Sequence, residues 1–390
     1  MAKRLTVLGS TGSIGENTLD IVARAESGTY KIVALTACRS AQKLAEQAIK
    51  FDAEFVALAD ESQGHILKSA LSGTKVQIGL GREALVEAAS LQADFTMAAI
   101  MGAAGLEPTL AAVKQGRHVG LANKECLVCA GDHFMSEVKK HGTTLLPVDS
   151  EHNAIFQVLE EETKGVRRLI LTASGGPFRT LSRDALKSVS CQDALAHPIW
   201  SMGAKISIDS ASLMNKGLEL IEASYLFDRP SAEIDVIVHP QSIIHSMVEY
   251  IDGSVLSQMG SPDMRTPIAY AMGWPARIAA PVERLDFAKI SELTFFEPDL
   301  DTFPALRLAR EALEAGGKAP NTLNAANEVA VEAFLSEKIG FLDISQIVER
   351  TLTQLSRDSD FSHPAASIDE ILASDAQARR TAHEQIVNLL

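Results

Sequence analysis

The sequence predicts an α/β protein in three parts: a Rossmann-like N-terminal domain, a central α+β domain with antiparallel strands, and an all-α C-terminal domain. Up to about residue 149, short β-rich runs alternate with helical patterns, which is typical of βαβ units and a parallel sheet. Hairpin signals and glycine–proline breaks follow, and only helical patterns remain beyond about residue 300. The predicted limits are 1–149, 150–273 with a lid at 175–203, a linker at 274–300, and 301–390.

Length, composition and charge narrow the class of protein. The chain has 390 residues, 46% of them hydrophobic, and a formal net charge of -14. This charge argues against nucleic acid or an anionic membrane as the main partner. No run of 18 apolar residues occurs, and the four cysteines are too few for a disulfide scaffold. Because the first β-rich run starts almost at Met1, we expect no signal peptide and a cytoplasmic protein.

A glycine-rich turn follows the first β-rich run. The runs of the N-terminal part are residues 5–8, 32–36, 55–59, 95–99, 118–121 and 144–148. Gly9, Gly12 and Gly15 come directly after the first of them and before a helical pattern over residues 16–24. Such glycines let the backbone approach a pyrophosphate, and the helix N-terminus offers unpaired N–H groups. The turn predicts a dinucleotide site, with a plain tight loop as the alternative.

The end of the second run indicates which dinucleotide is bound. An NAD site usually has an acidic residue there, which accepts from the ribose 2′-hydroxyl. This chain instead has Cys38, Arg39 and Ser40, with no acid and one arginine. A guanidinium pairs well with a 2′-phosphate, so NADP is favoured over NAD. The alternative is that Arg39 only caps a loop.

Two carboxylates follow the last run of the N-terminal part. Asp149 and Glu151 are one residue apart. In an extended chain they would point the same way, with Cα atoms about 6.6 Å apart. Two such carboxylates can converge on one hard divalent cation and leave positions open for substrate oxygens. The alternative is a solvated acidic turn.

Polar residues gather on a later helical pattern. Asn215 and Glu219 are four residues apart and share one helix face, and Ser210 at the preceding turn can point to the same place. Together with Lys216 they predict a phosphate-and-metal surface, with a charged helix face as the alternative. We expect residues 321–328 to cap a C-terminal helix. Residues 234–238, 243–250 and 255–258 are expected to form antiparallel strands.

Two further segments carry candidate ligand-binding residues. Asn123, Lys124 and Glu125 close another run, where they could contact both nicotinamide and substrate; a solvated strand end is the alternative. In residues 175–203, Trp200 and Met202 lie among prolines and glycines, which suggests a mobile lid with an apolar face. A tryptophan fixed in a core is the alternative there.

With these pieces together, the chain resembles the 1-deoxy-D-xylulose 5-phosphate reductoisomerase family over essentially its whole length. The motifs that carry the resemblance are residues 9–15, 122–125, 147–153, 172–178, 197–203 and 210–219. The resemblance implies NADPH- and metal-dependent rearrangement and reduction of 1-deoxy-D-xylulose 5-phosphate to 2-C-methyl-D-erythritol 4-phosphate, on the methylerythritol phosphate route to isoprenoids. It also implies a homodimer. Cys38 and Ala173 depart from the family pattern, which often has glycine at both positions.

The resemblance also implies roles for individual residues. The metal ligands would be Asp149, Glu151 and Glu219, holding Mg²⁺ or Mn²⁺, with Co²⁺ as a further option. The sugar phosphate would contact Lys124, Ser150, Glu151, Ser174, His197, Ser210, Asn215, Lys216 and Glu219. NADPH would contact Thr11, Gly12, Ser13, Ile14, Cys38, Arg39, Ser40, Asn123, Glu125 and Gly203. The catalytic set would be Lys124, Asp149, Glu151, His197 and Glu219.

Two other classes of protein share the predicted N-terminal fold. One is another NADP-dependent oxidoreductase of the homoserine or semialdehyde dehydrogenase type. The other is a non-catalytic NADP-binding sensor. Neither needs Asp149, Glu151 and Glu219 as a metal triad, so dependence of turnover on a divalent cation distinguishes both from the reductoisomerase.

Overall fold

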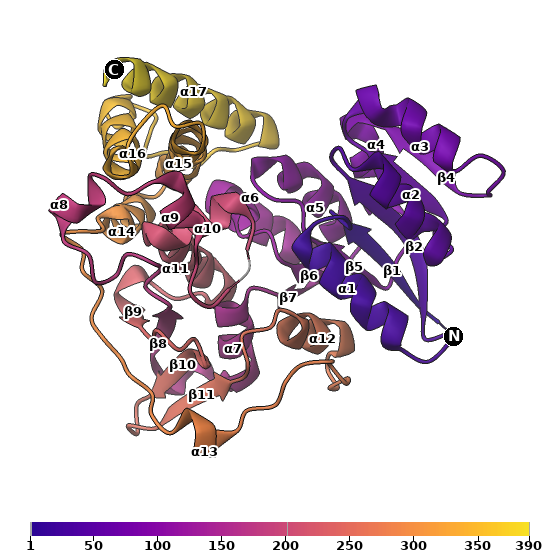
Figure 1. Cartoon of the computed structure of the whole chain (residues 1–390), viewed down its shortest axis with the longest axis horizontal. Coiled ribbons are helices and arrows are strands. Elements are labelled where there is room, and N and C mark those ends of the chain that lie inside the picture. The colour runs from indigo at the N-terminus through magenta and orange to yellow at the C-terminus, as the bar shows by residue number, and fades with distance from the viewer. Residues whose placement is uncertain (1, 201, 390) are drawn as a thin grey trace. The chain divides into compact units, whose positions relative to one another are not determined.

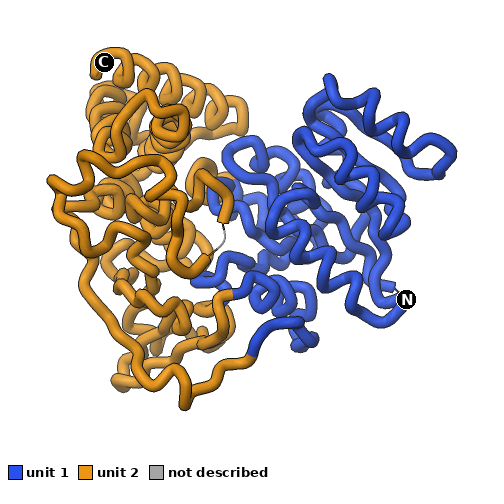
Figure 2. The backbone as a smooth tube through the Cα atoms, in the orientation of Figure 1, with its two compact units in different colours: residues 1–126, 134–153, 263–283 blue, residues 127–133, 154–262, 284–390 orange. Residues whose placement is uncertain are grey.

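The computed structural model describes residues 2–200 and 202–389, which form two compact units (Figure 2). Unit 1 comprises residues 1–126, 134–153 and 263–283, and unit 2 comprises residues 127–133, 154–262 and 284–390. The two units are defined by which residues pack together, and residues 263–283 pack with the N-terminal part. Such units are not the same as domains, so the domain limits expected from the sequence stay a prediction. Ser201, in the predicted lid, lies outside the described residues.

Unit 1 is built on a parallel sheet of seven strands in the order β4-β3-β2-β1-β5-β6-β7 (Figure 1). The strands are β1 (Lys3–Leu8), β2 (Tyr30–Ala37), β3 (Phe55–Leu58), β4 (Gln77–Leu80), β5 (Phe95–Ala98), β6 (His118–Leu121) and β7 (Thr144–Pro147). Strand β1 pairs with both β2 and β5, so the strand order reverses at this point. Ligands of doubly wound sheets bind at such a switch point, beyond the carboxyl ends of the strands. The predicted Rossmann-like fold is confirmed.

Helices connect these strands. They are α1 (Ser13–Arg24), α2 (Ala41–Lys50), α3 (Gly64–Ala70), α4 (Gly81–Ser90), α5 (Leu106–Val113), α6 (Glu125–His141) and α7 (Ser150–Val158), with single 3-10 turns at Glu61–Gln63 and Ala103–Gly105. Helix α12 (Arg265–Gly273) returns from later in the chain and packs on α1. An ion pair of 3.0 Å between Arg265 of α12 and Asp20 of α1 joins the two helices. The sequence analysis missed β4, α3 and α6, because short or kinked elements leave a weak periodic pattern.

Unit 2 contains a mixed sheet in the order β11-β10-β8-β9. Its strands are β8 (Val166–Ala173), β9 (Ile234–Val238), β10 (Ile244–Tyr250) and β11 (Val255–Met259). The predicted hairpin of β10 and β11 is confirmed. The expectation that residues 234–238 join it as an antiparallel strand is wrong, since β9 pairs with β8 in parallel. The long helical connection between β8 and β9 permits this parallel pairing.

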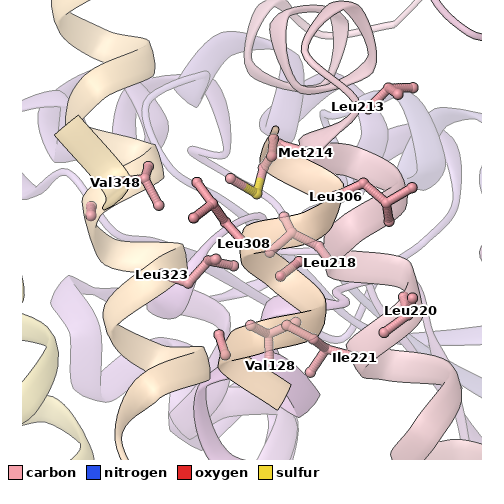
Figure 3. Packing of buried hydrophobic residues seen from close by; sticks show 14 of the residues in the cluster. Val128, Leu213, Met214, Leu218, Leu220, Ile221, Leu306, Leu308, Leu323 and Val348 are labelled. Atoms are coloured by element: carbon pink, nitrogen blue, oxygen red, sulfur yellow. The ribbon is translucent and has the colours of Figure 1, made fainter. Parts of the chain in front are cut away.

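Helices complete unit 2. They are α8 (Arg183–Leu186), α9 (Cys191–Leu195), α10 (Ala204–Ala211), α11 (Met214–Phe227), α13 (Phe287–Ile290), α14 (Ala305–Ala315), α15 (Ala319–Leu335), α16 (Phe341–Leu355) and α17 (Ile368–Val387), with 3-10 turns at Thr163–Gly165 and Ser231–Glu233. The predicted helical C-terminal region is confirmed. Leu218, Ile221, Leu308 and Leu323 from α11, α14 and α15 meet in one buried core (Figure 3). Among the described residues, no helix combines the length and apolar character needed to cross a bilayer.

The sequence analysis expected residues 321–328 to cap a helix, and this expectation is wrong. They lie inside α15, and Asn321, Asn324 and Asn327 are buried there. Asparagine is a poor residue for a helix interior and a good one for a cap, which explains the error. The burial of three amides in one helix requires hydrogen-bond partners from neighbouring elements.

Candidate functional site

The glycine turn after β1 has the conformation that a pyrophosphate site needs. Gly9 has a φ of +82°, and a Cβ there would lie 2.6 Å from the carbonyl oxygen of Ala99. A Cβ on Gly15 would lie 2.4 Å from the carbonyl oxygen of Gly9. Helix α1 begins at Ser13, while Gly12 and Ser13 are exposed. Only glycine fits the two crowded positions, and the resulting turn presents the helix N-terminus to an anion.

A residue that the sequence analysis missed holds this turn in place. The hydroxyl of Ser10 donates to Oε1 of Gln47 over 2.7 Å, and Nε2 of Gln47 donates back to the carbonyl oxygen of Ser10 over 2.9 Å. Thr36 accepts from the N–H of Gly9 through its side chain, at 2.8 Å. Helix α2 and strand β2 thereby fix the turn. Gln47 looks like any surface glutamine in a helical pattern, so the sequence gives no sign of this role.

The end of β2 exposes the predicted 2′-phosphate residues. Cys38, Arg39 and Ser40 are all exposed. Nε of Arg39 lies 3.7 Å from Oδ2 of Asp60, and 83% of its side chain is exposed. A hydrogen bond from Ser62, with a smaller contribution from Arg39, lowers the pKa of Asp60. The guanidinium therefore has one weak, solvated partner and is accessible to a ligand phosphate.

Asn123 ties two loops together after β6. Its Nδ2 donates to the carbonyl oxygens of Ile100 and Gly102, and its Oδ1 accepts from the N–H of Cys126 over 3.2 Å. The buried side chain thus joins the loop after β5 to the start of α6. Asn123 shapes the strand ends at the switch point through these backbone contacts.

Lys124 and the two predicted metal-binding carboxylates of unit 1 lie together. Nζ of Lys124 lies 2.6 Å from Oδ2 of Asp149. One carboxylate oxygen of Asp149 and one of Glu151 are within 4.8 Å of each other, and the hydroxyl of Ser150 donates to Glu151 over 2.6 Å. The extended geometry expected for this pair is wrong, because Glu151 lies in the first turn of α7. Two carboxylates beside one ammonium group suit a hard divalent cation and an oxygen-rich substrate.

His152 is a neighbour of this pair that the sequence analysis did not assign. It is buried, and one of its ring nitrogens lies within 4.8 Å of a carboxylate oxygen of Asp149. Asp149 and His152 are three residues apart, and α7 starts between them. This spacing is the only signal in the sequence that the two side chains lie close together.

In unit 2, Ser174 and Ser210 belong to segments that pack closely. Strand β8 ends just before Ser174, and Gly175 and Gly176 follow with φ values of +80° and +68°. A Cβ on Gly176 would lie 2.8 Å from the carbonyl oxygen of Ser210. The expectation that Ser210 lies in a turn is wrong, since it is in the last turn of α10. The glycine-rich turn therefore sits directly on the end of that helix.

His197 makes the most specific polar contacts of this region. Its Nδ1 lies 3.2 Å from the N–H nitrogen of Ile199 and 2.9 Å from that of Trp200, while its Nε2 lies 2.9 Å from Oγ of Ser174. Backbone N–H groups only donate, so Nδ1 must accept and the proton of the neutral ring is on Nε2. Burial lowers the pKa of His197, which favours this neutral form. His197 is thereby a fixed donor toward Ser174.

Helix α11 carries the three remaining predicted residues in its first two turns. Asn215 and Lys216 both donate to the carboxylate of Glu219. The amide of Asn215 donates to Oε1 of Glu219, and the ammonium group of Lys216 donates to Oε2. The predicted shared face of Asn215 and Glu219 is confirmed. Lys216 and Glu219 are both buried. A buried lysine at a helix N-terminus provides a positive charge and N–H donors for an anion.

Each unit thus gathers its own share of the predicted residues. Unit 1 holds the glycine turn, the Arg39 segment, Lys124 and the Asp149–Glu151 pair; unit 2 holds Ser174, His197, Ser210 and the α11 residues. Gly203 is exposed at the start of α10. A doubly wound sheet with an arginine after its second strand, together with a carboxylate pair and an anion-binding helix, defines a dinucleotide-dependent enzyme of phosphorylated substrates.

Comparison with known families specifies this class. Residues 5–131 match the family model "1-deoxy-D-xylulose 5-phosphate reductoisomerase", and residues 145–227 match its C-terminal domain. Residues 259–381 match the "DXP reductoisomerase C-terminal domain". The chain belongs to the 1-deoxy-D-xylulose 5-phosphate reductoisomerase family.

Similar proteins span the whole chain. The chain is 57% identical over 385 residues to the 1-deoxy-D-xylulose 5-phosphate reductoisomerase of Rhodospirillum centenum, covering 98% of this chain and 94% of the relative. A solved structure of the Zymomonas mobilis enzyme with NADPH is 51% identical, with a TM-score of 0.92 and 99% of each chain covered. A reductoisomerase structure with NADPH, fosmidomycin and magnesium has 44% identity, a TM-score of 0.94 and the same coverage.

Proposed function

We propose that this chain converts 1-deoxy-D-xylulose 5-phosphate to 2-C-methyl-D-erythritol 4-phosphate, using NADPH and a divalent cation. The main support for this proposal is that the chain matches the family over its full length. A relative with 57% identity covers 98% of the chain. A similar structure contains NADPH and magnesium, the two groups predicted here. A match of this extent favours the reductoisomerase over a homoserine-type dehydrogenase or an NADP-binding sensor.

The site residues predicted from the sequence supply the binding groups. Asp149, Glu151 and Glu219 would hold the metal, because all three offer the oxygen ligands that Mg²⁺ and Mn²⁺ prefer. The crowded glycines at positions 9 and 15 allow the tight turn that presents the N-terminus of α1 to a pyrophosphate. Arg39 and Ser40 would bind the 2′-phosphate of NADPH.

The substrate phosphate would be bound by side chains of unit 2. Ser174, Ser210 and Asn215 offer neutral donors, and Lys216 offers a charge. His197 adds its Nε2 proton on the side of Ser174, and its lowered pKa keeps it a neutral donor near pH 7. Anchoring the phosphate in this way orients the rest of the sugar for reaction.

The reacting end of the substrate would lie against Lys124 and Ser150. When bound, the divalent cation supplies Lewis acidity to the substrate oxygens, and NADPH supplies the hydride. Lys124 places an ammonium group 2.6 Å from Asp149, where it can donate to a developing oxyanion. Ser150, beside Glu151, offers a hydroxyl to the same oxygens.

The assay that tests this function follows NADPH absorbance with 1-deoxy-D-xylulose 5-phosphate, with and without Mg²⁺. We expect oxidation of NADPH only when substrate and metal are both present, and restoration of turnover by Mg²⁺ or Mn²⁺ after chelation. Turnover that survives a chelator would favour a metal-independent dehydrogenase. Binding of NADPH without any turnover would favour a sensor.

We further propose a cytoplasmic homodimer that associates through the strands of residues 234–258, of which β10 and β11 form an antiparallel hairpin. Val255 and Leu256 on the edge strand β11 are 48% and 42% exposed, and an exposed apolar edge strand favours association. Sedimentation should give a dimer mass for the wild-type chain and a lower mass for Leu256→Glu. An unchanged dimer in that variant would move the interface elsewhere.

A further inference from the structure

Three buried asparagines in α15 each bind a different helical segment of unit 2, which includes residues 127–133 of α6. Nδ2 of Asn321 lies 2.9 Å from the carbonyl oxygen of Ile371 in α17. Nδ2 of Asn324 lies 3.4 Å from Sγ of Cys129 in α6. Nδ2 of Asn327 lies 2.7 Å from Oδ1 of Asp209 in α10. All three side chains are at most 3% exposed. Of the three, only Asn327 contacts a helix that carries a predicted substrate-binding residue.

Asp209 is a buried carboxylate held by two partners. It is 1% exposed. Its Oδ2 lies 2.9 Å from Nζ of Lys205, one turn earlier in α10, and its Oδ1 accepts from Asn327. A carboxylate can only accept hydrogen bonds, so the amide of Asn327 must be oriented with its NH₂ toward Asp209. A buried charge needs all of its partners, and loss of one is costly.

This contact determines where the end of α10 lies on α15. Asp209 directly precedes Ser210, and α10 packs on α15. The turn after Ser174 rests on the same end of the helix, where a Cβ on Gly176 would meet the carbonyl oxygen of Ser210 at 2.8 Å. A shift of α10 would therefore displace both serines of the proposed phosphate site.

We propose that Asn327 is a positioning residue for phosphate binding and acts through Asp209. Its amide holds the carboxylate, the carboxylate fixes the end of α10, and this places Ser210 and the turn after Ser174. The inference rests on the proposed function, which assigns the phosphate to these serines. Asn327 itself need not touch the substrate.

The matched control is Asn321, which has the same residue type, helix and burial but binds α17. The measurement is calorimetric binding of inorganic phosphate to the NADPH-loaded full-length protein, together with kcat, KM and the melting temperature. Asn327→Ala should weaken phosphate binding and raise KM by about tenfold, because a charge-assisted hydrogen bond is lost. NADPH affinity and kcat should stay within about twofold of wild type. Asn321→Ala should lower the melting temperature similarly and leave phosphate affinity unchanged.

The exchange Asp209→Asn with Asn327→Asp adds a rescue test. The double variant keeps one carboxylate and one amide across the same contact, so it should recover most of the phosphate affinity. If Asn327→Ala does not fold, Asn327→Ser replaces it with the same expected direction.

Equal phosphate affinity in the Asn327 and Asn321 variants would overturn the positioning role, and so would a wild-type protein that binds no phosphate. A wild-type protein that binds phosphate but does not turn over the sugar phosphate would refute the proposed reaction alone. In that case the two asparagine variants would still test the positioning role.

Discussion

The two units hold their predicted functional residues in different ways. In unit 1 these residues follow strand ends: the glycine turn comes after β1, Arg39 after β2, Lys124 after β6 and Asp149 after β7. In unit 2 most of them lie inside helices, with Ser210 in α10 and Glu219 in α11. A parallel sheet gathers its strand ends at one edge by topology alone. A helical site instead depends on buried polar contacts between elements, such as that of Asn327 with Asp209.

The largest effect should come from Glu219, the carboxylate on α11 that is proposed as a metal ligand. Glu219→Gln removes the charge but keeps the shape, so this metal ligand would be lost. We expect turnover to fall at least about 100-fold, since even residues behind a metal ligand cost 10- to 100-fold. NADPH binding should be unchanged, because its predicted residues other than Gly203 belong to unit 1. Steady-state kinetics and Mn²⁺ titration by paramagnetic resonance measure both effects.

The control for this variant is Glu249→Gln. Glu249 is also a largely buried carboxylate of unit 2, paired with Arg167 and Arg168 on the sheet. Its loss should affect stability and leave turnover near wild type. Near-normal turnover in Glu219→Gln would mean that Glu219 is not a metal ligand.

The next effect tests the strand-end residues of unit 1. Arg39→Ala should weaken NADPH binding roughly 10- to 100-fold and leave NADH binding almost unchanged, because only NADPH offers a 2′-phosphate to the guanidinium. Arg24→Ala is the control, since Arg24 is another exposed arginine of unit 1 and pairs with Asp20 at the far end of α1. Cofactor titrations by fluorescence quenching measure the affinities. Equal weakening of both cofactors would make Arg39 a structural residue.

The units should also differ in their response to acid. Burial, with smaller contributions from Lys216 and His239, lowers the pKa of His245 in unit 2 from 6.5 to about 4. Neutral His245 is therefore favoured by folding, and this contribution is present above pH 6.5 and is lost as the pH falls toward 4. At pH 5 the loss is about 2 kcal/mol. In unit 1, burial and Lys3 lower the pKa of His118 in the same direction, but that side chain is only partly buried.

Denaturant unfolding at pH 7 and pH 5 measures this difference. His245→Gln keeps a neutral polar side chain at both pH values, so its unfolding free energy should change by about 2 kcal/mol less than that of the wild type between them. His118→Gln should have a smaller effect. The same pH dependence in His245→Gln and wild type would assign the acid sensitivity to other groups.

The contrast between the units also explains what the sequence could predict. Short β-rich runs that alternate with helical patterns are local signals, so the parallel sheet was predicted correctly. The parallel pairing of β9 was missed, because strand direction depends on a long connection that no local pattern encodes. The roles of Gln47 and Asn327 were missed for a related reason: each side chain bonds to a residue far away in the sequence. Family motifs supplied the unit 2 residues that helical periodicity alone left ambiguous.

Part of the proposed lid, residues 175–203, packs into the core of unit 2, which restricts how much of the segment can move. Phe178, Leu186 and Ala194 are buried in its core and anchor the first part of residues 175–203. Any ligand-dependent movement should therefore be confined to about residues 196–203, which include Trp200. The ring of Trp200 lies 6.1 Å from that of His245 in unit 2, whereas Trp274 packs edge-on against His118 in unit 1.

The smallest predicted effect is a ligand-dependent change at Trp200. In a Trp274→Phe background, a phosphonate analogue should change Trp200 fluorescence and slow chymotryptic cleavage next to it, because the anchored phosphate provides the binding energy for closure. An analogue without the phosphonate group should do neither. Arg179, Arg183 and Lys187 are exposed in the anchored part, so tryptic cleavage there should be indifferent to ligand. Cleavage and fluorescence at Trp200 that ignore a saturating phosphonate would mean that the indole is fixed in place and that unit 2 binds its substrate without a lid.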